Sequence, residues 1–144
     1  MAGIFLEEQR LWSAKGTYID DKGRKIKATG ETEVLFKRGK ITIESTMRLP
    51  VKANKMLELK NVYHVKPVKK GRHETEWESK NPTSGNFKGK FLIAGTYIVS
   101  TYISTDNKYT GFETFEFRQD GSYMNKGCLF FGDNKVSEWE MVLS

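Results

Sequence analysis

The strongest constraint in this sequence is a repeated two-residue alternation between apolar and polar side chains. In the clearest stretch, Ile41, Ile43 and Leu49 lie on one side of an extended segment and charged or hydroxyl residues lie on the other. Successive side chains of a β-strand point to opposite faces, so this spacing predicts a strand with one buried and one solvated face. The same alternation returns in 57–65 and 138–143.

Turn-forming residues separate the alternating segments. Clusters of Gly, Asp, Asn and Lys occur at 20–23, 37–39, 69–71, 106–108, 120–121 and 132–134. Such residues accept a positive φ or bond to their own backbone, as hairpin turns require. They divide the chain into about nine or ten strands, a number at which an open twisted sheet curls or closes. The sequence therefore predicts an all-β fold: a single closed antiparallel β-barrel of about 8–10 strands.

The N-terminal segment is the exception to this pattern. Ile4, Glu8 and Leu11 are spaced as one face of a short helix, so we expect a helical turn from Ile4 to Leu11 that covers an open end of the barrel. A chain of 144 residues fits one ordinary domain and has no room for a separate cofactor-binding unit. We therefore interpret residues 1–144 as a single domain.

Short motifs recur within the chain. Gly16-Thr17-Tyr18-Ile19 returns as Gly95-Thr96-Tyr97-Ile98, and Thr29-Gly30 returns as Thr110-Gly111. One interpretation is an internal duplication with copies at about 11–80 and 90–144. The other is chance similarity, because strands of one composition produce such matches on their own.

Several motifs, taken in order, resemble those of uncharacterised bacterial lipocalin-like proteins. They are Gly16-Thr17-Tyr18-Ile19-Asp20-Asp21, Met47-Arg48-Leu49, Glu76-Trp77-Glu78-Ser79-Lys80-Asn81-Pro82, Tyr109-Thr110-Gly111 with Glu113, and Ser137-Glu138-Trp139-Glu140. Gly16-Thr17-Tyr18 stands where lipocalins have Gly-x-Trp. The resemblance implies a closed antiparallel barrel of the calycin kind with a small-molecule cavity, and it supplies no catalytic residue and no named ligand.

Charge and cysteine content narrow the class of partner and the compartment. The chain has 24 Lys and Arg against 18 Asp and Glu, a net charge of +6. Its densest basic segment, 66–72, contains Pro67 and Gly71, which indicates a solvated hairpin tip rather than a nucleic-acid surface. The single cysteine, Cys128, excludes an internal disulfide, and we expect a cytoplasmic protein. Apolar runs fall far short of the roughly 20 residues of a membrane span, so no membrane association is expected.

Familiar catalytic and metal motifs are missing. No Gly-Lys pair is followed by the hydroxyl residue of a phosphate loop, and no serine lies in a Gly-x-Ser-x-Gly turn. His64 and His73 flank the basic turn without a convergent carboxylate, and a zinc site needs three or four ligands. Cys128 has no neighbouring acid or base. We therefore expect neither a metal nor a cofactor.

Glu113 is the residue with the most chemical interest. Glu113 lies two and four residues before Phe115 and Phe117, so all three are expected on the same strand face, towards the barrel interior. Desolvation there raises the pKa of a carboxyl group. Trp77 and Trp139 are each flanked by glutamates, which directs their indoles inward, either as core or as a surface that stacks on a ligand. The predicted ligand-binding residues are Ser45, Asn61, Tyr63, Trp77, Tyr102, Glu113, Phe115, Phe117, Asn125 and Trp139. The alternative is that the polar members satisfy one another, or bind buried water, in a filled barrel.

Three functional hypotheses follow. The first is a binding protein that takes a small apolar or aromatic molecule into the barrel. The second is a barrel enzyme in which Glu113 acts as general acid or base for an isomerisation, cyclisation or decarboxylation. The third is an interaction module whose basic outer face binds an anionic partner.

Overall fold

The chain closes into one antiparallel barrel of ten strands. The computed structural model describes residues 4–81 and 85–144. The strands are β1 (Arg10–Ile19), β2 (Lys25–Lys37), β3 (Lys40–Lys52), β4 (Lys55–Val65), β5 (Glu74–Asn81), β6 (Gly85–Ala94), β7 (Tyr97–Ser104), β8 (Tyr109–Phe117), β9 (Tyr123–Phe131) and β10 (Asn134–Leu143). Each strand pairs with its neighbours in sequence, and β1 pairs with β10 to close the barrel. The predicted all-β barrel is confirmed.

The strands turn where the sequence places turn chemistry. All six predicted clusters lie between consecutive strands. Two further hairpin turns, at 53–54 and 95–96, lie outside the predicted set. Asn54 (φ 64°) and Gly95 (φ 62°) supply the positive φ in these turns. Each of these turns contains one residue with a positive φ instead of the two of a type I′ turn, which makes its sequence signal weak.

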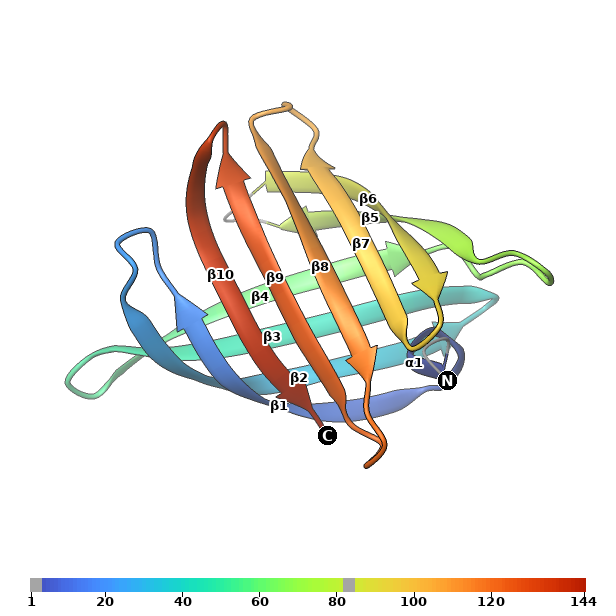
Figure 1. Ribbon diagram of the computed structural model, residues 1–144, viewed down its shortest axis with the longest axis horizontal. Helices are drawn as coiled ribbons and strands as arrows, with labels where there is room; N and C mark the ends of the chain where they lie inside the picture. Colours follow the sequence, from blue (N-terminus) through green and yellow to red (C-terminus); the bar gives the residue numbers. More distant parts are fainter. Residues whose placement is uncertain (1–3, 82–84) are drawn as a thin grey trace.

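The barrel consists of two crossing layers. In Figure 1, β7 to β10 run across the front, while β2, β3 and β4 cross behind them at a steep angle. The narrowest contact joins β4 and β5, which pair only over Tyr63–Val65 and Trp77–Ser79. The inward faces of the two layers enclose the hydrophobic core and, beside this narrow contact, a cavity.

A short helix, α1 (Ile4–Glu7), packs into one end of the barrel. The Phe5 side chain is fully buried, and its ring stacks on that of Phe115 with 4.7 Å between centroids. The backbone N–H of Phe5 also donates to the hydroxyl of Tyr123 at 3.1 Å. The helix is shorter than predicted: Leu11 already belongs to β1, pairs with Glu33 and is 60% exposed. The β1–β2 ladder takes the backbone groups that a longer helix would use.

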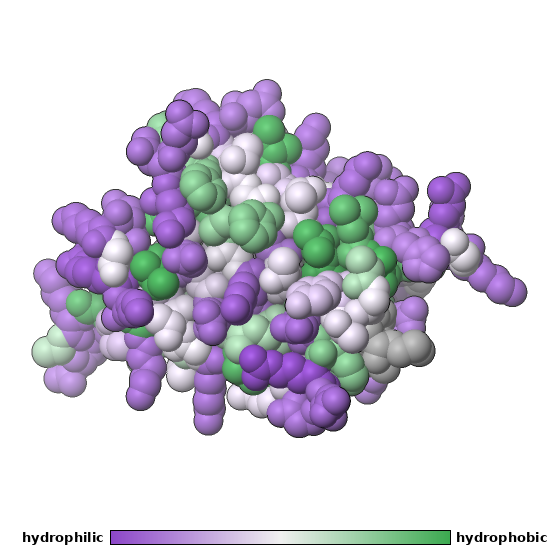
Figure 2. All heavy atoms as spheres, viewed as in Figure 1, coloured by the Kyte–Doolittle hydropathy of each residue, from purple (hydrophilic) through white to green (hydrophobic). Residues whose placement is uncertain are grey.

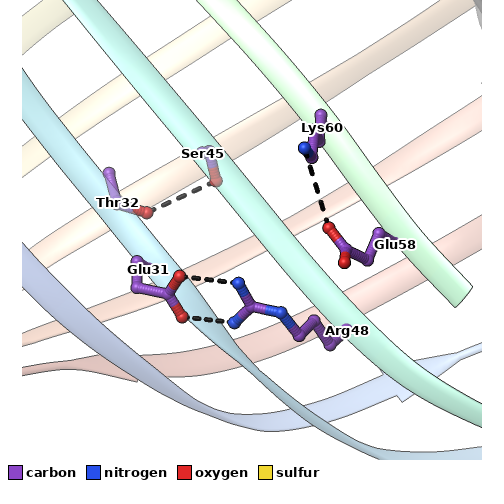
Figure 3. A network of polar contacts seen from close by, with 6 residues as sticks. All are labelled: Glu31, Thr32, Ser45, Arg48, Glu58 and Lys60. Atoms are coloured by element: carbon purple, nitrogen blue, oxygen red, sulfur yellow. Dashed lines mark hydrogen bonds and ion pairs between the residues drawn. The ribbon is translucent and has the colours of Figure 1, made fainter. Parts of the chain in front are cut away.

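Ion pairs on the outside and hydroxyls on the inside show how the strands alternate. Figure 3 shows Arg48 of β3 beside Glu31 of β2. Both terminal guanidinium nitrogens of Arg48 donate to the Glu31 carboxylate, and the Nη2–Oε1 distance is 2.8 Å. The adjacent residue, Thr32, points the other way and meets Ser45 at 3.3 Å. Exposed ion pairs contribute little stability, so the buried face holds these strands together.

The outer surface is mostly hydrophilic. Figure 2 shows hydrophilic side chains around the rim and the loop tips, with apolar side chains gathered over β7, β8 and β9. In the described part of the chain, no helix is long and apolar enough to cross a membrane.

Candidate functional site: the barrel cavity

The barrel holds an internal cavity of about 250 Å³. Its lining comes from both layers: Tyr18, Ser45, Met47, Leu59, Asn61, Tyr63, Trp77, Ser79, Asn81, Phe87, Tyr102, Glu113, Asn125, Leu129, Val136, Ser137 and Trp139. Aromatic rings form much of this wall, and amide, hydroxyl and carboxyl groups are distributed among them. The volume lies between the roughly 150 Å³ that accommodates benzene and the roughly 300 Å³ at which drug-sized sites begin.

Two tryptophans reach across glycines to shape the cavity wall. Trp77 on β5 lies over Gly89 on β6, where a Cβ would come within 2.6 Å of the indole ring. Trp139 on β10 lies over Gly127 on β9 in the same way, and a Cβ there would overlap the ring. A glycine opposite an aromatic residue leaves the space in which the ring lies flat against the strand.

The N–H group of each indole donates a hydrogen bond to a polar side chain two strands away. The Trp77 N–H donates to Ser100 Oγ at 2.9 Å, and the Trp139 N–H donates to Glu113 Oε2 at 3.1 Å. Both acceptors are buried. The two hydrogen bonds therefore hold Trp77 and Trp139 in fixed orientations.

Glu113 carries the ionisable group of this cavity. It lies on β8 and is 8% exposed, as its parity with Phe115 predicted. Burial raises the pKa of its carboxyl group to about 7, and hydrogen bonds from Asn125 and Trp139 partly oppose that rise. Near neutral pH the carboxyl group is therefore divided between its acid and its ionised form.

Two tyrosines face the same carboxyl group. Burial, followed by the charge of Glu113, raises the pKa of Tyr63 and of Tyr102, so both stay neutral phenols. The Tyr102 hydroxyl donates to the backbone carbonyl of Cys128 at 2.7 Å. The structure places the Tyr102 ring in the cavity wall.

Amide side chains supply the remaining polar contacts. Asn81 donates to the side-chain oxygen of Asn61 and to the backbone carbonyl of Lys60, the latter at 3.0 Å. Asn125 donates to the carbonyl of Thr114 at 3.2 Å. These bonds fix the amides in place, as the filled-barrel alternative expected, yet the cavity between them stays open.

The predicted ligand-binding residues divide into two groups. Eight of them line the cavity: Ser45, Asn61, Tyr63, Trp77, Tyr102, Glu113, Asn125 and Trp139. Phe115 stacks on Phe5, and Phe117 lies 5.2 Å from the ring of Tyr123, both towards the end that α1 covers. Phe115 borders a separate space of about 20 Å³ below Glu113, enough for one water molecule. Ligand contact by any of the ten stays a prediction.

Sequence reasoning missed about half of the cavity wall. The missed residues are Tyr18, Met47, Leu59, Ser79, Asn81, Phe87, Leu129, Val136 and Ser137. The two-residue alternation gave a signal for several of them. Met47 lies on the same strand face as Ser45, Leu59 on the same face as Asn61, and Ser79 and Asn81 on the same face as Trp77. Ser137 lies on the same strand face as Trp139. Only for Val136 does the alternation mislead, because the pairing of β10 with β9 shifts register between Lys135 and Ser137.

The outer surface carries a second, more open hollow of about 950 Å³ over β3 to β7. Among the described residues, five Lys and Arg side chains and two Glu side chains line this hollow, and both glutamates lie close to lysines. Glu76 lies opposite Lys90, Glu78 lies opposite Lys88, and Lys66 pairs with Glu76 at 3.2 Å. The basic turn at 66–72 lies beside this groove, and binding of an anionic partner there stays a prediction.

Metal-ligating side chains do not gather in the barrel. His64 and His73 are exposed on either side of the basic turn. Within residues 4–81 and 85–144, no three His, Cys, Asp or Glu side chains come close enough to hold a metal ion. The side chains that line the cavity with Glu113 are neutral hydrogen-bonding groups, aromatic rings and aliphatic groups.

Comparisons with known proteins find a structure of similar fold but no related sequence family. The barrel is similar to the S-type phycobiliprotein lyase CPES from Guillardia theta, with a TM-score of 0.69 over 96% of this chain and 89% of that chain. The sequences are 7% identical, so the similarity concerns the fold alone. No protein-family model matches the chain, and no curated protein matches it significantly. The chain thus shares its barrel fold with a lyase.

Proposed function

We propose that this protein binds a small, flat, largely apolar molecule inside the barrel. The observation that carries the proposal is the 250 Å³ cavity, in which aromatic walls surround a few fixed polar groups. Small-molecule sites in general have this composition: an apolar lining supplies affinity, and a few polar groups set the orientation. The fold, shared with a phycobiliprotein lyase, supports this proposal.

The wall favours a planar ligand. Tyr63 and Trp77 meet at 4.8 Å between ring centroids, and Tyr102 lies 5.8 Å from Trp77. A flat ring that enters beside them gains offset or edge-to-face contact on more than one side. The volume limits the enclosed part of such a ligand to one or two rings.

The proposal includes a finer family assignment. We infer that the chain is related to bacterial lipocalin-like proteins, because its short motifs follow their order along most of the sequence. Trp77, Glu113 and Trp139, which belong to these motifs, also line the cavity. This overlap between motif and cavity supports binding as the shared property.

Fluorescence of a neutral reporter tests the proposed function. N-phenyl-1-naphthylamine brightens when it leaves water for an apolar site, so titration into the full chain is expected to give saturable enhancement with one site. Ser79→Phe places an aromatic ring in the cavity and is expected to abolish the enhancement. Lys80→Phe adds the same ring to the exposed face of the same strand and is expected to leave it intact.

The controls make this result decisive. Leu59→Trp fills the cavity from β4 and serves if Ser79→Phe does not fold, which thermal unfolding reveals. Equal enhancement by the wild type and by both cavity-filling variants would place the dye on the outer surface and refute the proposed function. Absence of enhancement in the wild type would refute it as well.

A second candidate function is proton transfer by Glu113. A buried carboxyl group with a pKa of about 7, next to a cavity of substrate size, meets the requirements of a general base. The probe is 5-nitrobenzisoxazole. Glu113 would accept its C3 proton while the N–O bond breaks, giving 2-cyano-4-nitrophenolate. We expect turnover that rises with pH to a plateau above 7 and is lost in Glu113→Gln; a rate equal to that of the variant would exclude this function.

A further inference from the structure

We propose that the cavity selects an aromatic cation, such as an amidinium or a protonated amino-heterocycle, and that Glu113 binds its charged head. The inference rests on the proposed function and specifies its ligand class. It starts from the distribution of charge around the cavity rather than from the shape of the wall.

The distribution of charge in the cavity wall is one-sided. Among the described residues that line the cavity, Glu113 is the single carboxyl group, and no Lys, Arg or His is present. A buried carboxylate without a counter-ion is costly. The compensating charge must come from a proton or from a bound cation, and a ligand that brings the charge displaces the proton.

The polar groups that line the cavity with Glu113, from both layers of the barrel, are neutral. They include Ser45 of β3, Tyr63 of β4, Tyr102 of β7, Asn125 of β9 and Trp139 of β10. Burial raises the pKa of both tyrosines, so neither ionises near pH 7. The charge state of the site therefore follows the Glu113 carboxyl group alone.

Glu113 keeps hydrogen-bonding capacity for a ligand. An ionised carboxylate offers about four lone-pair sites. Trp139 takes one, at 3.1 Å on Oε2, and Asn125 takes a second. Two sites remain for a planar cation with two parallel N–H groups, which matches a carboxylate in a bidentate manner. The aromatic wall adds cation–π attraction, which neutral and anionic ligands lack.

Three ligands of one shape separate charge from shape. Benzamidine is a cation throughout pH 6 to 8, benzamide is neutral, and benzoate is an anion. Isothermal titration calorimetry on the full chain is expected to give benzamidine roughly tenfold or greater preference over benzamide at pH 8, as a charge-assisted hydrogen bond provides. Benzoate is expected not to bind, because its charge repels that of Glu113.

The pH dependence identifies the group responsible. Because the pKa of Glu113 is about 7, its ionised fraction rises about tenfold between pH 6 and pH 8. Benzamidine affinity is expected to rise by up to that factor, while benzamide affinity stays level. Glu113→Gln keeps the shape and is expected to remove both the preference and the pH dependence. Glu116→Gln, on the same strand outside the cavity, is expected to retain them.

Each contrary outcome is distinct. Equal affinity for benzamidine and benzamide, or a preference that survives Glu113→Gln, would overturn the cation proposal and leave small-molecule binding intact. Binding of the neutral reporter dye without binding of benzamidine would likewise overturn the cation proposal and leave small-molecule binding intact. Failure of the reporter dye in the wild type would instead refute the proposed function on which this inference rests.

Discussion

Ser100 and Glu113 are paired residues on β7 and β8, and each accepts the indole N–H of a tryptophan that reaches it across a glycine. Trp77 arrives from one side and Trp139 from the other. The two contacts have the same form, but one acceptor is a hydroxyl and the other an ionisable carboxyl. This difference gives the cavity a single ionisable centre between two fixed aromatic walls.

Ser100 holds Trp77 by a buried hydrogen bond, and its loss has a defined cost. Ser100→Ala leaves the Trp77 N–H without its acceptor, and an unsatisfied buried donor costs about 1–3 kcal/mol. We expect the free energy of unfolding from urea titrations to fall by that amount. Thr101→Ala, on the exposed face of the same strand, is expected to change it little. Equal losses in the two variants would contradict the role of the hydrogen bond.

Glu113 makes stability depend on pH. Its carboxyl pKa is about 7 in the folded chain against 4.5 as the ordinary value. Between these values the folded chain holds more protons than the unfolded chain, so this contribution is intact below about pH 4.5 and lost as pH rises through 7. Its full size is on the order of 2–4 kcal/mol.

Glu113→Gln removes this dependence. The stability of wild type relative to the variant is expected to fall from pH 5 to pH 8, as measured by urea unfolding at each pH. The difference between the two proteins cancels the other carboxyl groups, such as Glu31, whose pKa is lowered chiefly by its hydrogen bond to Arg48 and which acts in the opposite direction. A wild-type-to-variant difference that does not change with pH would show that Glu113 titrates as an ordinary carboxyl.

Gly127 sets the position of Trp139. A methyl group at this position would overlap the indole ring, so Gly127→Ala forces the ring away from β9 and from Glu113. Overpacking of this kind costs about 1–3 kcal/mol. We expect lower thermal stability and a changed Trp139 emission spectrum, read in a Trp12→Phe, Trp77→Phe background. Lys126→Ala, exposed on the same strand, serves as the control, and an unchanged spectrum in Gly127→Ala would refute the prediction.

Phe5 anchors α1 in the barrel end. Its side chain is fully buried against Phe115 and Tyr123, so Phe5→Ala removes a large apolar contact and leaves a hole. Such substitutions cost about 3–5 kcal/mol. We expect this loss in equilibrium unfolding and faster amide exchange at the closed end. Glu7→Ala, on the exposed side of α1, is expected to be near neutral; a similar small effect for Phe5→Ala would mean that the helix is dispensable.

The direction of side chains along a strand could be predicted because it depends only on residues that are adjacent in the sequence. Ile41 and Ile43 face inward as predicted, and Glu113 is buried because it shares the parity of Phe115. Alternation does not predict the direction of a side chain where strand pairing is irregular, as at the register shift between Lys135 and Ser137. The division into two copies, 11–80 and 90–144, stays a prediction.

The helical turn shows the limit of local spacing. Ile4 to Leu11 has helical periodicity, yet only Ile4–Glu7 is helical, because β2 offers Leu11 a pairing partner from a distant part of the chain. The local pattern carries no information about that partner.

Neighbouring residues alone carry the two-residue period of a strand, so the order of amino acids was enough to predict short strands with one apolar face and their closure into a β-barrel. The contact of Trp139 with Glu113, the packing of Phe115 on Phe5 and the open space between the layers became visible only in the folded chain. Those outcomes depend on the order, register and crossing angle of strands far apart in the chain, which no local spacing encodes.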